Sequence, residues 1–347
     1  MPPVSDDTVD VAIVGAGIAG LVCARELLAA GLRVLVLEKS RGVGGRCATR
    51  RMMGQPVDFG LAYYHSDDDD LLAALADVPA TVLRGWPHRV AGSGPPCHPA
   101  AFRPGQQRLA YAEGVNAWPR QIARDVPLRL GARVTRIRTD GRGVVLDVED
   151  GAPQRARDVV LTMPAPQSQA VLPSEEGRTL RAVHALLESV RSFPSVTLVA
   201  GYDPAAGDPG FDILYPEGSE ILQLVAHDSA KRADPTYRVL VAQARAEWSR
   251  AHLERGPDVW RAALVDELAR LCGAWARETA WSDVHRWRYA KVELSTEMSA
   301  PLVFGLPGGS RLGLASDAFT REAGVQGAFR AGRGLARRLL EDHANAG

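Results

Sequence analysis

A glycine-rich run near the beginning of the chain has the spacing of a phosphate-binding turn. Residues 15–20 read Gly-Ala-Gly-Ile-Ala-Gly and follow directly on an apolar stretch. At this spacing Gly15 permits a tight turn, Gly17 lets the backbone approach a pyrophosphate, and Gly20 allows a helix to pack closely on a strand. Glu38 ends the next apolar stretch, where a carboxylate accepts hydrogen bonds from ribose hydroxyls and repels a 2′-phosphate. The pattern predicts a dinucleotide site.

A second glycine-rich run follows closely and narrows the kind of dinucleotide. Residues 41–46 read Arg-Gly-Val-Gly-Gly-Arg. Gly44 and Gly45 permit close backbone approach, and Arg46 can place its guanidinium against phosphate oxygens. Two more arginines follow at positions 50–51, so positive charge gathers where a pyrophosphate is expected. A plain NAD dehydrogenase has no need of this second run.

These groups need a strand–turn–helix–strand unit to hold them. Val9–Val14 has the apolar pattern of a buried parallel strand, and Leu21–Ala30 has the apolar spacing of a helix that ends at Gly31. Arg33–Leu37 predicts the second strand. Together they predict a βαβ unit. The phosphates would lie at the helix N-terminus, where free N–H groups and the helix dipole favour an anion.

The rest of the chain predicts a mixture of strands and helices. Strands are expected at Arg133–Arg138, Val144–Glu149, Arg157–Thr162, Val196–Gly201, Ile221–His227, Arg238–Ala244, Val284–Ala290 and Leu312–Ala315. Helices are expected from the acidic run Asp67–Asp70 onward and at Asn116–Arg124, Arg178–Val190, Asp258–Ala274 and Gly327–Glu341. The four strands from Val196 to Ala290 are expected to form one antiparallel sheet. The prolines of Met163–Pro166 predict a crossing between domains there.

Composition excludes several classes of protein. Among 347 residues there are 41 basic and 41 acidic side chains, so no global field attracts nucleic acid or anionic lipid. A hydrophobic content of 46% excludes disorder, and the length favours about two domains. Cysteines 23, 47, 97 and 272 have no metal-binding spacing, and no metal is expected. Without an apolar run approaching ~20 residues, we expect a cytoplasmic protein that does not enter the membrane.

The motifs together resemble one family of flavoproteins. A run that ends in Gly-Gly-Arg just after the acidic residue is typical of the FAD-binding domain of the flavin amine oxidase superfamily. Within it, four further motifs resemble the renalase-like proteins, and their order extends over nearly the whole chain. These motifs are residues 46–51, 58–60, 285–290 and 324–329, the last preceded by Asp317. Departures at Leu61, Ala62 and Gln326 concern the substrate pocket more than the cofactor site.

The resemblance implies an α/β fold with FAD as the cofactor. A discontinuous Rossmann-like FAD-binding domain would comprise residues 1–75, 105–165 and 293–347, and a substrate domain with an antiparallel sheet residues 76–104 and 166–292. The residues implied to bind FAD are Gly15, Gly17, Ile18, Ala19, Gly20, Glu38, Lys39, Arg41, Gly45, Arg46, Val134, Asp317, Gly324, Val325, Gln326 and Ala328.

Flavin oxidation needs mainly geometry from the protein, since the cofactor accepts the hydride. The resemblance implies an oxidase of isomeric dihydronicotinamide dinucleotides, with O2 as the acceptor of electrons. A flavin amine oxidase or a biosynthetic dehydrogenase acting on another small molecule is the alternative, and a non-catalytic FAD-binding protein is a third reading. A monomer or a dimer fits each of these.

Candidate residues for the substrate pocket are few. Trp287 and Tyr289 share one face of an expected strand, with Arg286 and Arg288 on the other. Tyr63 and His65 follow the Asp58–Gly60 turn, and Lys291 follows the Trp287–Ala290 stretch. Each also has an ordinary structural interpretation, because aromatic residues in strands usually belong to a core and lysines are usually exposed.

Overall fold

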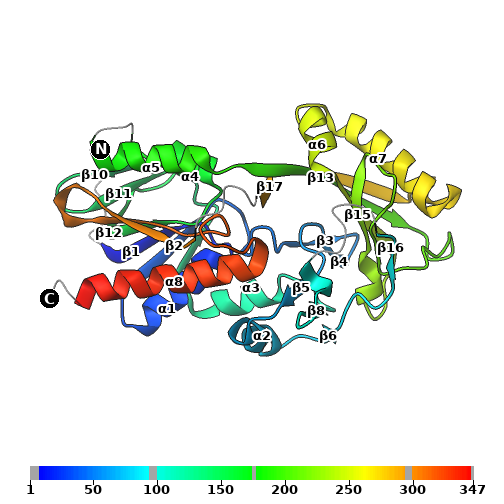
Figure 1. The fold of residues 1–347 in the computed structure, drawn as a ribbon, viewed down its shortest axis with the longest axis horizontal. Helices are drawn as coiled ribbons and strands as arrows, with labels where there is room; N and C mark the ends of the chain where they lie inside the picture. Colours follow the sequence, from blue (N-terminus) through cyan, green and yellow to red (C-terminus); the bar gives the residue numbers. More distant parts are fainter. Residues whose placement is uncertain (1–7, 94–99, 174–176, 294–298, 345–347) are drawn as a thin grey trace. The chain divides into compact units, whose positions relative to one another are not determined.

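The computed structural model describes residues 8–93, 100–173, 177–293 and 299–344, so Cys97 lies outside the described residues. The chain divides into two compact units, each assembled from separate stretches of sequence (Figure 1). The first unit comprises residues 1–45, 119–191 and 292–347, and the second unit comprises residues 46–118 and 192–291. Each unit is described below by itself.

The first unit is built on an eight-stranded sheet with a parallel centre. Its strands are β1 (Val9–Val14), β2 (Val34–Glu38), β9 (Leu128–Leu130), β10 (Val134–Thr139), β11 (Val144–Val148), β12 (Gln154–Leu161), β18 (Leu302–Gly305) and β19 (Arg311–Leu314). β1 lies between β2 and β12 and is parallel to both. β10 and β11 extend the sheet from β12 as an antiparallel meander. β19 pairs in parallel with β12, so a late segment of the chain completes the N-terminal sheet.

Helices cover this sheet and share its core. They are α1 (Ile18–Ala29), α4 (Ala165–Val171), α5 (Arg178–Ser189) and α8 (Gly324–Ala344), and the sequence division between the units falls within α3 (Ala117–Ile122). α1 and α8 lie side by side (Figure 1). Glycine makes this approach possible, because a Cβ on Gly332 would lie 2.5 Å from the carbonyl oxygen of Ala19. Val171 of α4 and Leu187 of α5 are buried in the same core as β12.

The second unit is built on a six-stranded sheet in the order β17-β13-β16-β15-β14-β7. These strands are β7 (Val90–Ala91), β13 (Ser192–Tyr202), β14 (Ile213–Leu214), β15 (Leu222–His227), β16 (Arg238–Ala244) and β17 (Trp281–Val292). β13, β16, β15 and β14 are antiparallel neighbours, whereas β7 runs parallel to β14. α6 (Ala246–His252) and α7 (Pro257–Cys272) also belong to this unit, and α7 packs on one face of the sheet through Trp260 and Leu264.

The other face of this sheet packs against residues from the first part of the chain. They form the hairpin β3 (Thr49–Met52) and β4 (Gln55–Asp58), the small sheet β5 (Tyr64–Ser66), β8 (Gln107–Tyr111) and β6 (Val82–Arg84), and α2 (Asp69–Ala76). Short 3₁₀ helices occur at Ala100–Phe102, Ala123–Asp125, Asp228–Lys231, Ala274–Arg277 and Pro307–Gly309. The acidic run begins α2 as expected, with the Asp68 carboxylate accepting a hydrogen bond from the Leu71 N–H at 2.9 Å.

The units differ from the expected domains at three places. Residues 46–75 and 105–118 lie in the second unit, and residues 166–191 lie in the first. Met163–Pro166 is therefore no crossing point. It leads from the end of β12 into α4. The chain leaves the first unit only after Arg191, because α4 and α5 pack in the first unit's core. A compact unit is not the same as a ligand-binding domain, so the FAD-binding assignment of residues 46–75 stays a prediction.

Most predicted elements are present within a few residues of their expected bounds. α1 begins at Ile18 rather than Leu21, because the glycine turn leads straight into the helix. The six-stranded sheet is mixed rather than purely antiparallel, since the two-residue strands β7 and β14 join at its edge in parallel. Over the described ranges, none of the helices combines the length and the apolar character that crossing a membrane requires.

Candidate functional site

The glycine turn of the first unit leaves the N-terminus of α1 open. Gly15 has a φ of 108°, which only glycine adopts readily, and it turns the chain from β1 toward the helix. A Cβ on Gly20 would lie 2.0 Å from the carbonyl oxygen of Gly15, so helix and strand approach closely there. A Cβ on Gly17 would meet nothing within 4 Å, and this N-cap residue offers no side chain to the first-turn N–H groups. The helix end is thus free to receive an anion.

Glu38 is fixed beside this turn by two backbone hydrogen bonds. Its carboxylate accepts from the N–H of Ala16 at 2.8 Å and from the N–H of Ser40 at 2.8 Å. Each oxygen keeps a second lone pair, which a ribose hydroxyl can use. The following Lys39 donates to Gln167 Oε1 at 3.0 Å, so its ammonium already has a protein partner.

The second glycine run lies against the first within the same unit. The N–H of Gly44 donates to the carbonyl oxygen of Ala16 at 2.8 Å, and a Cβ on Gly45 would lie 3.7 Å from the Cα of Gly17. Gly44 and Gly45 both have positive φ values, 105° and 57°. The two runs therefore present backbone to the same place, as close approach to a pyrophosphate requires.

Other predicted cofactor residues of this unit lie on its sheet, just after β19 and on its last helix. Val134 is buried at the start of β10, and Asp317 is buried just after β19. Gly324, with a φ of 83°, begins α8, and Gln326 in its first turn donates to Glu322 Oε2 at 3.0 Å. The first unit thus contains each predicted cofactor residue except Arg46.

The arginines after the glycine run have protein partners in the second unit. Arg46 Nη1 donates to the carbonyl oxygen of Ala290 at 3.2 Å. Arg50 lies 3.6 Å from the carboxylate of Asp283, and Arg51 donates to the carbonyl oxygen of Gly54 at 2.7 Å. These three arginines were expected to place positive charge near a pyrophosphate. Each of them already contacts an acceptor within the protein. Arg46 as a pyrophosphate ligand stays a prediction.

In the second unit, β17 presents an aromatic face as its alternation predicted. Trp287 stacks on Phe59 with a centroid distance of 5.3 Å, and His285 meets Trp287 edge-on at 4.4 Å. The opposite face carries Arg286 and Arg288, both exposed and both paired with Glu254. Burial, with Arg50 nearby, lowers the pKa of His285 to about 4, so its ring is neutral at pH 7.

The other candidates of the second unit lie around the same segment. Tyr63 is buried, with its hydroxyl 3.0 Å from that of Tyr215. His65 Nδ1 lies 2.9 Å from Gln106 Oε1, and burial lowers the pKa of His65, so this ring too is neutral. Tyr289 is half-buried, and Lys291 is exposed at the end of β17. Exposure of Lys291 agrees with its ordinary structural interpretation.

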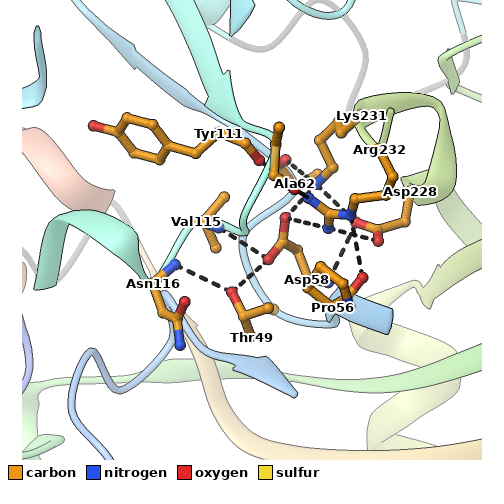
Figure 2. A network of polar contacts seen from close by, with 12 residues as sticks. Thr49, Pro56, Asp58, Ala62, Tyr111, Val115, Asn116, Asp228, Lys231 and Arg232 are labelled. Atoms are coloured by element: carbon orange, nitrogen blue, oxygen red, sulfur yellow. Dashed lines mark hydrogen bonds and ion pairs between the residues drawn. The ribbon is translucent and has the colours of Figure 1, made fainter. Parts of the chain in front are cut away.

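A buried ion network, shown in Figure 2, was not anticipated from the sequence. The Lys231 side chain is 0% exposed, and its Nζ lies 2.5 Å from Asp58 Oδ2 and 2.7 Å from Asp228 Oδ1. Arg232 contacts the same two carboxylates at 3.0 and 2.8 Å. Thr49 also donates to Asp58, at 2.5 Å. The Asp58-Phe59-Gly60 motif singled out Asp58 alone among these residues, without predicting its ion pairs. Lys231 and Arg232 lie far away in sequence, where no local pattern marks them.

The network anchors the segment that carries Phe59. Lys231 donates to the carbonyl oxygen of Ala62 at 2.9 Å, and Arg232 donates to that of Pro56 at 3.1 Å. The chain from Pro56 to Ala62, which includes Phe59, is thus held at both ends by buried charges. Burial alone would raise the pKa of Asp58, but Lys231 and Arg232 lower it below its usual value.

Comparison with known proteins shows the family. A model described as flavin containing amine oxidoreductase matches residues 82–340, and one described as NAD(P)-binding Rossmann-like domain matches residues 13–78. The chain belongs to the flavin-containing amine oxidoreductase family. This membership confirms the predicted FAD cofactor and the oxidoreductase class. The finer resemblance to renalase-like proteins stays a prediction.

Individual relatives match over shorter stretches. Putrescine oxidase of Kocuria rosea is 42% identical over 69 residues, which are 20% of this chain and 14% of that protein. Lysine-specific histone demethylase 1 homolog 1 of Arabidopsis thaliana is 46% identical over 76 residues, 22% of this chain and 7% of that protein. The matched stretches therefore span a small part of each relative.

The fold itself has a full-length counterpart among solved structures. Cyclohexylamine oxidase from Brevibacterium oxydans IH-35A superposes with a TM-score of 0.73 at 15% sequence identity, covering 97% of this chain and 100% of that one. At this identity the likeness concerns the fold alone. It confirms the predicted α/β class with a Rossmann-like domain and a second domain built on a sheet.

The residues of the first unit fit a flavin dinucleotide. The open position at Gly17 is the observation that decides this, because there is room beside the N-cap of a twelve-residue helix whose first-turn N–H groups have no side-chain cap. Glu38, with spare lone pairs, stands at the end of the adjoining strand. Anion-binding N–H groups beside a carboxylate are the donor set that a pyrophosphate and a ribose need.

Proposed function

We propose that this chain oxidises a small amine at the C–H bond next to its nitrogen, with FAD as the cofactor and O2 as the final acceptor of electrons. The observation that carries the proposal is the amine oxidoreductase match over residues 82–340, which extends far beyond the nucleotide-binding motif. In this reaction the C–H bond breaks, the nitrogen lone pair forms a C=N bond, and two electrons reach O2 to give hydrogen peroxide.

For cofactor binding we propose the residues of the first unit described above. The N–H groups at the start of α1 would bind the pyrophosphate, Glu38 the ribose hydroxyls, and Val134 would contact the adenine. Asp317 and the first turn of α8, with Gly324, Val325, Gln326 and Ala328, would contact the flavin end. When bound, the flavin supplies the hydride acceptor.

For the substrate we propose the aromatic cluster of the second unit, defined as Phe59, Tyr63, His285 and Trp287. Rings at this site orient a small apolar molecule and exclude water from it. Trp287 Nε1 is buried without a hydrogen-bond partner among the described residues, so it can donate to a substrate atom. The histidine ring is neutral. The Arg50 guanidinium lies 4.3 Å from the centroid of the Phe59 ring, so its positive charge disfavours an ammonium ion and favours an uncharged amine, whose free lone pair the oxidation requires.

A second candidate substrate has its own supporting observation. Residues 46–51 and 285–290 resemble renalase-like proteins, which oxidise dihydropyridine isomers of NAD(P). A dihydropyridine also carries its reactive C–H bond in a nitrogen ring and is uncharged there, so the same aromatic cluster would accept it.

Anaerobic mixing with a panel of donors tests both candidates. Small primary and secondary amines are expected to bleach the flavin absorbance, and admission of O2 should restore it with release of hydrogen peroxide. Bleaching by isomeric dihydronicotinamides, with no response to amines, would replace the first candidate by the second. A yellow protein that responds to neither would be a non-catalytic FAD-binding protein, and a protein that takes up no FAD would refute all three.

A further inference from the structure

Arg50 lies at the edge of the aromatic cluster and contacts two of its rings. Its guanidinium carbon lies 4.3 Å from the centroid of the Phe59 ring, and its Nη2 lies 3.3 Å from His285 Nδ1. Pairing with Val57 in the β3–β4 hairpin fixes the backbone of Arg50. Asp283 is a weaker partner at 3.6 Å, with both side chains about half exposed. Arg50 therefore brings a cationic hydrogen-bond donor to the edge of the cluster.

The contact with Arg50 decides which nitrogen of His285 carries a proton. A guanidinium has five N–H donors and no acceptor. Since Arg50 can only donate, Nδ1 of His285 must accept and is therefore unprotonated. A neutral imidazole has one N–H, so the proton is on Nε2. The low pKa of His285, about 4, agrees with a neutral ring.

Neighbouring rings hold this imidazole in place. Phe59 meets it at 5.1 Å between centroids and 81° between planes, and Trp287 meets it at 4.4 Å and 69°. His285 is half-buried. Its Nε2 keeps some accessible surface and has no hydrogen-bond partner among the described residues. The cluster thus presents a fixed N–H donor that a bound molecule can reach.

We propose that Arg50 keeps His285 in the Nε2–H tautomer, and that this N–H donates a hydrogen bond to an oxygen atom of the substrate. The inference rests on the proposed function and narrows its substrate class to small amines that also carry an ether, hydroxyl or carbonyl oxygen. The acceptor has to be an atom other than the amine nitrogen, because the lone pair of that nitrogen is needed for the C=N bond. His285 is thus a specificity-determining residue, and Arg50 is a positioning residue that acts through it.

Nitrogen NMR of the FAD-loaded protein with isotope-labelled histidine tests the role of Arg50. Wild-type His285 is expected to show a protonated Nε2 and an unprotonated Nδ1 at pH 7.5. Arg50→Met keeps an apolar stem against Phe59 but loses the donor, so both tautomers should be populated and the pKa of His285 should rise. Arg286→Gln removes a charge from the opposite face of β17 and is the matched control, with unchanged signals. A wild-type ring protonated on Nδ1 would overturn the proposal.

A pair of unreactive amines tests the role of His285. The first is cyclohexylamine with a methyl group on the carbon that bears nitrogen, and the second has an ether oxygen in place of the opposite methylene of its ring. Neither has a hydrogen on the carbon next to nitrogen, so both bind without oxidation. The preference for the ether amine, measured by isothermal titration, should be about fivefold greater in the wild type than in His285→Phe. Comparing these ratios removes the difference in basicity between the two amines.

NMR of the wild type gives a further test that needs no variant. The ether amine should shift the Nε2–H signal of His285 more than its carbon analogue does. Equal preference in the wild type and His285→Phe, a larger shift with the carbon analogue, or binding of neither amine would overturn the proposal. Failure of ordinary amines to bleach the flavin is a different result, because it would refute the proposed oxidation while the binding preference stays measurable.

Discussion

At the residue scale, Glu38 offers the most direct test of the cofactor site. Replacing Glu38 with Ala should weaken FAD binding by about tenfold or more, because it removes the acceptor for the ribose hydroxyls that two backbone hydrogen bonds hold in place. Titration of the apoprotein with FAD measures the change. Glu38→Gln is the matched control and should lose less, since it keeps one acceptor oxygen. Full flavin occupancy in the alanine variant would exclude Glu38 as the ribose ligand.

Replacing Lys231 tests how much the buried ion network stabilises the second unit. Lys231→Met should destabilise the second unit by about 3–5 kcal/mol, because two buried carboxylates lose a partner. Thermal unfolding followed by circular dichroism would show a lower midpoint. Adding Asp58→Asn to Lys231→Met should recover part of the loss, since the pair removes one positive and one negative charge together. A double variant less stable than the single one would contradict this account.

At the element scale, the glycines of the first turn separate folding from cofactor binding. Gly17→Ala should fold normally, since the new Cβ meets nothing and φ is already −76°, yet it should bind FAD more weakly by filling the space at the helix end. Gly20→Ala should fail to fold or lose much stability, because its Cβ would lie 2.0 Å from a backbone oxygen. Flavin absorbance and thermal midpoint measure the two effects. Normal flavin content in Gly17→Ala would argue against the pyrophosphate position.

The elements also show how far sequence could predict this protein. Local signals were sufficient for β1, α1, β2 and α7, because periodicity and turn residues lie within each element. They were insufficient for the two-residue strands β7 and β14, whose pairing depends on distant neighbours. Lys231 and Arg232 could not be identified for the same reason, since their partners come from the segment around Asp58. Residues 46–75 and 105–118 were assigned by their motifs to the FAD-binding domain. They lie in the second compact unit, because the burial of their side chains decides which segments pack together.

At the scale of the whole molecule, stability should fall in two stages on acidification. Burial lowers the pKa of His65, His227 and His285, so the unfolded chain binds more protons than the folded one as pH falls below 6.5. The three neutral histidines contribute to the free energy of unfolding above pH 6.5. This contribution is lost as the pH falls toward about 4, the pKa of His285. Asp58 has a lowered pKa, so its contribution is lost only below about pH 4.

Thermal midpoints measured from pH 8 to pH 3 test this expectation. His285→Gln should flatten the decline between pH 6.5 and 4 and leave the lower stage unchanged. Asp58→Asn should lower stability at neutral pH and reduce the lower stage. A midpoint that stays constant from pH 7 to 4 in the wild type would contradict the pKa directions given for the histidines.

The pairing of β19 with β12 has a consequence for synthesis of the chain. A ribosome releases residues 154–161 long before residues 311–314. The C-terminal part of β12, residues 159–161, therefore has no β19 partner until the end of the chain has been made. Until then the edge exposes unpaired backbone groups and apolar side chains, which can recruit another nascent chain. Contacts so distant in sequence also slow folding. We therefore expect chaperone dependence and sensitivity to expression rate to reside in the first unit.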